Sequence, residues 1–159
     1  MLRTMTESAR PLTTADVQAL EQRLGMILPA EYKSFLLRHN GGRPEPRAFP
    51  ITGLELNPFG AIQVFFGIDD PIESCNIEWN YECYRGRLLP NLLPIACDDG
   101  ADLVCLVVEG EDTGAVLFWD GYAVPDEPDC SNLYYLASSF AEFIDCLQDA
   151  PWDDETSNS

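Results

Sequence analysis

One segment, LPAEYKSFLLRHNGG at residues 28–42, specifies a complete helix with both of its ends. Pro29 suits the first helical position, because the N–H it lacks would have no partner there and its ring already holds φ at a helical value. The segment ends in Asn-Gly-Gly, and glycine adopts the left-handed conformation that closes many helices. Side chains at the spacing of one helical face form the expected packing surface: Leu28, Tyr32, Phe35, Leu36 and His39. This face must pack against a second element.

Three further segments carry helix signals. Threonine at 13 or 14 can cap a first helix, and a short connection from it to the helix at 28–42 predicts a helix pair. Ser139 and Glu142 have the spacing of a capping box ahead of an apolar stripe. The expected helices run from Thr13 or Thr14 to Gly25, from Asp69–Pro71 to Gly86, and from Ser139 to Leu147.

Short apolar runs between these helices are typical of strands, because they are rich in β-branched and aromatic residues and too short for amphipathic helices. Acidic and glycine-containing turns separate the later runs, which favours an antiparallel meander. The expected strands are residues 49–51, 61–68, 92–97, 103–108, 115–119 and 133–136. The prediction is a single α+β domain over residues 13–150, with a mostly antiparallel sheet of about five or six strands. An N-terminal helix pair, a middle helix and a C-terminal helix pack against the sheet.

The two ends of the chain and its cysteines indicate the cellular compartment of the protein. Residues 1–12 are expected to be a loose leader, and residues 151–159 a disordered acidic tail. No apolar run approaches the ~18 residues that span a bilayer, and the first residues lack the apolar region of a signal peptide. We therefore expect a cytoplasmic protein without membrane contact. The six cysteines are expected to be reduced and mostly buried, since several lie within apolar segments and no C-x-x-C pair occurs.

Charge is the strongest signal in the composition. The formal net charge is -18, from 27 acidic and 9 basic residues. The distribution is uneven, because residues 88–159 contain sixteen Asp and Glu and no Lys or Arg. Such a half-molecule repels nucleic acid, so direct DNA or RNA binding is not expected. Two interpretations stay open: an acidic surface that only keeps the protein in solution, and one that attracts a basic partner.

Catalytic and metal-binding patterns are few. The sequence lacks a G-x-S-x-G elbow, a P-loop and a G-x-G-x-x-G motif, and its single histidine, His39, is expected to be packed against the core. A cysteine–histidine pair assembled by the fold stays open. Asp98, Asp99 and Asp102 are expected to be an acidic hairpin turn, with a calcium or magnesium site as the alternative. We expect no cofactor, no metal and no enzymatic activity.

The order of these motifs resembles the SUKH superfamily, which includes fungal cell-wall regulators of the Smi/Knr type and many bacterial immunity proteins. The resemblance covers about residues 13–147. It is carried by LPAEYKSFLLRHNGG at 28–42, LLPIACDDGADLVCL at 92–106, GAVLFW at 114–119 and ASSFAEFIDCL at 137–147. Cys97 with its adjacent acids, and the long proline-rich segment 43–58, depart from the family pattern.

The resemblance implies an α+β fold without catalysis and a role as an immunity protein that neutralises a cognate toxin, often a nuclease. The acidic half adds a physical reason, because an acidic surface can mimic phosphates and steer a basic toxin into contact. The residues expected to contact the partner are Asp98, Asp99, Asp102, Asp120, Tyr122, Asp126, Glu127 and Asp129. Two alternatives are a general protein- or peptide-binding regulatory module of the same fold and, less favoured, a metal-dependent enzyme that uses the acidic turn.

Overall fold

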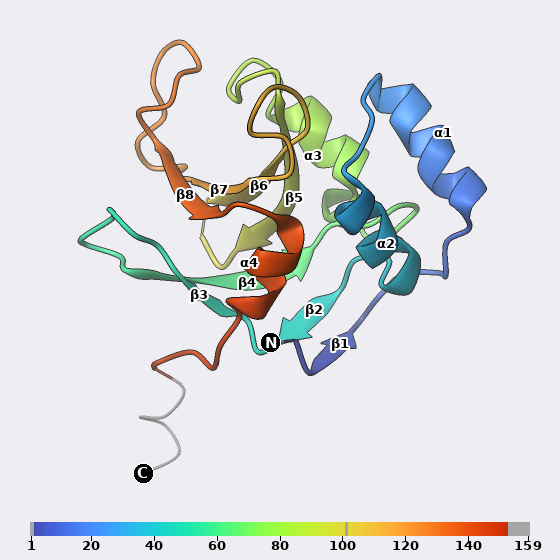
Figure 1. Cartoon of the computed structure of the whole chain (residues 1–159), viewed down its shortest axis with the longest axis horizontal. Helices are drawn as coiled ribbons and strands as arrows, with labels where there is room; N and C mark the ends of the chain where they lie inside the picture. The colour runs from blue at the N-terminus through green and yellow to red at the C-terminus, as the bar shows by residue number, and fades with distance from the viewer. Residues whose placement is uncertain (1, 101, 153–159) are drawn as a thin grey trace.

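A computed structural model of the chain describes residues 2–100 and 102–152. Among them, six strands form an antiparallel sheet in the order β3-β4-β5-β6-β7-β8. The strands are β3 (Ala48–Pro50), β4 (Phe59–Phe65), β5 (Leu92–Asp98), β6 (Leu103–Val107), β7 (Val116–Trp119) and β8 (Leu133–Ala137). The sheet is strongly curved, and a two-stranded ribbon of β1 (Thr4–Thr6) and β2 (Arg43–Glu45) lies beside it (Figure 1).

The described helices are α1 (Thr14–Leu24), α2 (Ala30–Arg38), α3 (Ile77–Cys83) and α4 (Phe140–Asp145), with a 3-10 turn, η1 (Glu73–Cys75), before α3. Helices α1 and α2 form the expected pair, α3 contacts β5, and α4 lies across the sheet in front of β3 and β4 (Figure 1). The predicted α+β class, with a mostly antiparallel sheet and these helices against it, is confirmed.

The core is built from aromatic side chains of the helices and the inner face of the sheet. Phe35 of α2 lies 4.8 Å from Phe140 of α4 and 5.1 Å from Phe65 of β4, measured between ring centroids. Phe143 of α4 lies 5.6 Å from Phe49 of β3 in the same way. Each of these rings is buried, and burying such a side chain stabilises the fold by about 1.5–3 kcal/mol. Helix α4 therefore packs against both α2 and the sheet and links them.

Helix ends follow the sequence signals closely in α1 and less closely in α4. The Thr13 hydroxyl accepts the N–H of Asp16, the Asp16 carboxylate accepts the N–H of Thr13, and Gly25 closes α1 in the left-handed conformation. Ser139 caps α4 by accepting the N–H of Glu142. The Glu142 carboxylate, however, binds Ser138 rather than the cap residue, so the reciprocal half of the predicted capping box is shifted by one residue.

The glycines after α2 serve a close approach between backbones as well as a helix end. Helix α2 ends at Arg38 with His39 extended, and the left-handed residue is Gly41. A Cβ atom on Gly41 would lie 2.8 Å from the carbonyl oxygen of Phe65. Gly42 and Phe65 exchange two backbone hydrogen bonds of 3.1 and 2.8 Å. The Asn-Gly-Gly sequence thus lets the chain run directly against the end of β4.

Three predictions at segment boundaries need correction. Residues 4–6, in the segment expected to be a loose leader, pair with residues 43–45, because that extended segment offers an unpaired strand edge. The middle helix begins at Ile77 rather than at Asp69–Pro71, since the Asn76 amide binds carbonyl groups of the preceding turn and holds it outside the helix. Helix α2 begins at Ala30, with Pro29 as its cap. Of the predicted tail, residues 153–159 lie outside the described residues.

The six cysteines are all free in the structure. Cys105 is buried, but Cys83 and Cys130 are exposed, so burial is less general than expected. In the described part of the chain, no helix has the length and apolar character needed to cross a membrane.

Candidate functional site

Two turns meet at one end of the sheet, and we call them together the acidic end: residues 98–102 between β5 and β6, and residues 120–132 between β7 and β8. They share that end because alternate hairpins of an antiparallel sheet turn on the same side. The N–H of Gly121 donates a 2.8 Å hydrogen bond to Oδ1 of Asp102 and so joins the two turns. Each of the eight residues predicted to contact a partner lies in these turns.

Asp98 and Asp102 are buried and hold the first turn in shape. Oδ1 of Asp98 accepts the N–H of Gly100 at 2.8 Å and the N–H of Asp102 at 3.3 Å. Their exposed fractions are only 8% and 5%, respectively. The two carboxylates therefore face the protein, and their contact with a partner stays a prediction.

The Asp102 carboxyl is the most perturbed acid of the site. Burial, a hydrogen bond with the Asp98 side chain and the nearby charge of Asp120 raise its pKa to about 7, against the opposing N–H of Gly121. A protonated Asp102 carboxyl can donate a hydrogen bond to the Asp98 side chain while its Oδ1 accepts the N–H of Gly121.

The second turn is held by a buried asparagine that sequence reasoning did not single out. Asn132 is 1% exposed, and its amide donates to the carbonyl of Asp120 at 3.0 Å. The N–H of Asp120 donates back to the carbonyl of Asn132 at 2.9 Å. An asparagine between a polar loop and a strand is a weak signal, since the same residue type is common in exposed loops.

The remaining predicted residues present their side chains at or near the surface. Asp120 accepts the N–H of Tyr122 at 2.9 Å, and the Tyr122 side chain is 78% exposed. Hydrogen bonds from Ser131 lower the pKa of Asp129. The Asp126 and Glu127 carboxylates are exposed and make no hydrogen bond or ion pair within the described chain. The loop thus offers a group of ionised carboxylates around one exposed aromatic ring.

The Lys and Arg side chains of this protein neutralise little of the negative charge of the acidic end. Eight ion pairs occur among the described residues, and they engage seven of the nine cations. Only two of their carboxylates, Asp99 and Asp149, belong to residues 88–159. Asp99 pairs with Arg47 at 3.1 Å. The acidic end therefore keeps most of its charge available to another molecule.

The alternative of a metal site in the first turn gains no support from its geometry. Asp98 and Asp102 use oxygens to accept backbone N–H groups, while Asp99 points to Arg47. In the described ranges, no three carboxylate, thiol or imidazole side chains are grouped as metal ligands would be.

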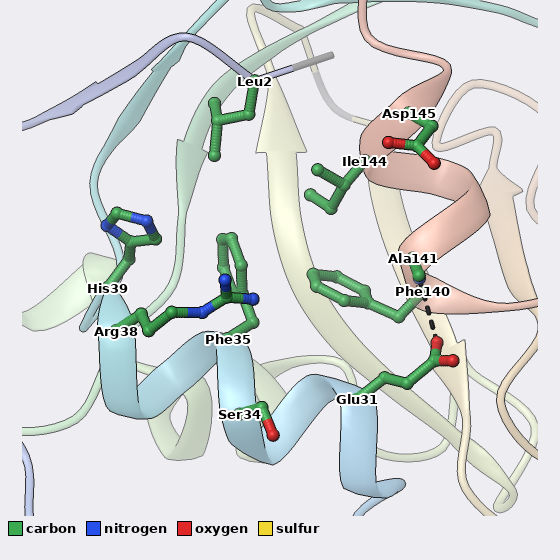
Figure 2. A pocket seen from close by; sticks show the side chains of 10 residues that line it. All are labelled: Leu2, Glu31, Ser34, Phe35, Arg38, His39, Phe140, Ala141, Ile144 and Asp145. Atoms are coloured by element: carbon green, nitrogen blue, oxygen red, sulfur yellow. Dashed lines mark hydrogen bonds between the residues drawn. The ribbon is translucent and has the colours of Figure 1, made fainter.

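A hollow of about 480 Å³ lies between α2 and α4 (Figure 2). None of its lining residues belongs to the acidic end. The rings of Phe35 and Phe140 form its apolar floor, and Glu31 crosses to α4 by accepting the N–H of Ala141 at 3.0 Å. His39 lies at its side, half-buried against the ring of Phe35. Burial and the charge of Arg38 lower the pKa of His39, which favours the neutral, packed imidazole expected from its place on the helix face.

Comparisons with known proteins agree with this architecture. Residues 11–146 match the model of the SMI1 / KNR4 family (SUKH-1). One curated relative, the SPbeta prophage-derived uncharacterized protein YokK of Bacillus subtilis (strain 168), is 27% identical over 155 residues, which cover 87% of this chain and 76% of the relative.

Proposed function

The chain belongs to the SMI1 / KNR4 family (SUKH-1), and from that premise we propose that it is a non-catalytic cytoplasmic immunity protein that neutralises a bacterial toxin. The proposed toxin is basic, with a nuclease as the favoured kind, and it binds at the acidic end. Family membership supports this setting, because the family includes many bacterial immunity proteins, and the similar Bacillus subtilis protein is prophage-derived.

The observation that carries the proposal is the uncompensated charge of the acidic end. Ionised carboxylates at low cation density raise the encounter rate with a positively charged partner and select against anionic ones. A nuclease presents a positive cleft to the phosphates of its substrate, and a carboxylate cluster offers the same pattern of charge. Binding there would cover the cleft without any chemistry by this chain.

The site residues divide into two roles under this proposal. Asp99, Asp120, Tyr122 and the acids of residues 126–129 make the contacts, with the exposed Tyr122 ring as the anchor, because aromatic side chains dominate many interfaces. Asp98 and Asp102 act through the turns that they hold.

One observation favours a second function, that of a peptide-binding regulatory module. The hollow between α2 and α4 combines an aromatic floor with charges of both signs, which suits a peptide better than a strongly basic toxin. A peptide bound there would contact Arg38 and Glu31, and its affinity would not depend on the acidic end.

Binding to the protein encoded by the neighbouring gene tests the proposal. Raising NaCl from about 0.05 to about 0.5 M should weaken binding at least about tenfold, since screening removes the attraction between charges. The double variant D126N/E127Q should slow association several-fold, whereas the matched variant E45Q/E73Q, which removes two exposed acids elsewhere, should leave it unchanged. An affinity that is insensitive to both salt and D126N/E127Q would refute the acidic end as the binding surface.

A further inference from the structure

Strand β8 is the last strand of the curved sheet and pairs with β7 alone among the described strands. An end strand keeps a row of peptide N–H and C=O groups that can pair with another chain. Its Tyr135 is 57% exposed, although it lies in register with the half-buried Leu117 of β7. The strand thus offers both unpaired backbone groups and an exposed aromatic ring.

A hollow of about 320 Å³ lies beside Tyr135 on the outer face of the sheet. Val107, Ala115 and Leu117 supply apolar lining, and the carboxylates of Glu111 and Asp112 lie at its rim. Both acids are exposed and make no ion pair within the described chain. The hollow therefore suits an apolar side chain followed by a cation.

Acidic groups flank β8 at both of its ends. Residues 111–112 belong to the turn before β7, which reaches the C-terminal end of β8 because Val116 pairs with Ala137. Residues 126–129 belong to the loop that leads into its N-terminal end. Five residues of strand span about 17 Å, so the two acidic groups lie about one short peptide apart.

We propose that β8 binds an extended segment of a basic partner, which adds to the sheet as a further strand. The segment carries an apolar side chain over Leu117 and Tyr135 and cationic side chains at both ends. This inference rests on the proposed function and names the part of the toxin that is recognised. A second copy of this chain is a poor occupant, because pairing β8 with β8 would bring the acidic flanks of both copies together.

The same acids have a simpler explanation, since charged residues beside an end strand also prevent unwanted pairing between molecules. The two explanations differ in one respect. If the acids only prevent unwanted pairing, β8 should bind no strand at all. If they select a partner, β8 should bind cationic strands and reject anionic ones.

The test uses the full chain labelled with ¹⁵N and a peptide probe, acetyl-Lys-Lys-Val-Thr-Val-Lys-Lys-amide. The control probe has glutamate in place of every lysine. The lysine peptide should shift the amide signals of β8, Leu117 and residues 111–113 and slow hydrogen exchange in β8, and the glutamate peptide should do neither. Y135A and E111Q/D112N should each weaken binding of the lysine peptide at least about fivefold, whereas I27A, at an exposed apolar residue elsewhere, should not.

Three results would overturn the inference: no binding of the lysine peptide, equal binding of both peptides, or signal changes spread over the acidic surface with Y135A binding as well as the wild type. Its failure is distinct from that of the proposed function. A toxin that is neutralised equally by wild type and Y135A would refute the role of β8 alone. A peptide that binds at β8 in a protein that neutralises no toxin would refute the immunity role alone.

Discussion

Two regions of the molecule contrast with each other: the aromatic contact between α2 and α4, and the acidic end. They are built from different kinds of side chain. The first is a set of buried aromatic rings closed by α4, and the second is a pair of turns held by buried Asp98, Asp102 and Asn132. Apolar packing loses nothing when the pH changes, whereas a buried carboxyl pair exchanges a proton with the solvent. The difference teaches that the aromatic contact stabilises the fold at any pH, whereas the acidic end carries exposed charge and makes a contribution to stability that depends on pH.

The largest effect should come from the aromatic contact. F140A removes a buried ring that lies 4.8 Å from Phe35 and 5.3 Å from Tyr32, and it should lower the free energy of unfolding by about 3–5 kcal/mol in urea titrations. L37A, at a partly exposed residue of α2, should cost under about 1 kcal/mol. The affinity of the folded F140A protein for its partner should equal that of the wild type. A lower affinity would show that the two regions are not independent.

An intermediate effect is expected from pH at the acidic end. The raised pKa of Asp102, about 7 against an ordinary 3.8, means that the native state keeps a proton that the unfolded chain releases. Stability from this group is therefore present at low pH and is lost as pH rises from about 4 to 7.

D102N should remove that loss, because an amide can donate to Asp98 at any pH. The free energy of unfolding, measured in urea, should favour D102N over wild type more at pH 8 than at pH 4.5. D99N changes an exposed acid and should instead follow the wild-type curve. Taking the difference between variant and wild type cancels His39, whose lowered pKa has the opposite sign. Parallel curves for D102N and wild type would show that Asp102 titrates normally.

The aromatic contact could be predicted from the sequence because its signals are local. The spacing of Tyr32, Phe35 and Leu36 marks a helix face, and Phe140 and Phe143 repeat the pattern in α4. Asn40 could not be predicted in this way. It is buried, donates to the carbonyls of Ile68 and Arg10, and accepts the N–H of Ile68, yet in sequence it resembles any residue at a helix end.

The acidic end was predicted in location and only partly in detail. Composition identifies the region, because charge is counted without knowing the fold. It does not separate buried Asp98 and Asp102 from exposed Asp126 and Glu127, since burial depends on which loops meet across strands. The hydrogen bond from Gly121 to Asp102 joins residues that no periodicity relates.

The smallest effect on stability should come from the carboxylates that the proposed function needs most. D126N/E127Q removes two exposed charges without a partner in the described chain, so the free energy of unfolding should change by at most about 0.5 kcal/mol. Any change should be a gain that shrinks as salt rises, because repulsion among like charges is relieved. Thermal unfolding at low and high NaCl measures it. A loss of more than about 1 kcal/mol would mean that these acids hold the loop itself, and slower toxin association by D126N/E127Q would then report a misfolded loop rather than a lost attraction.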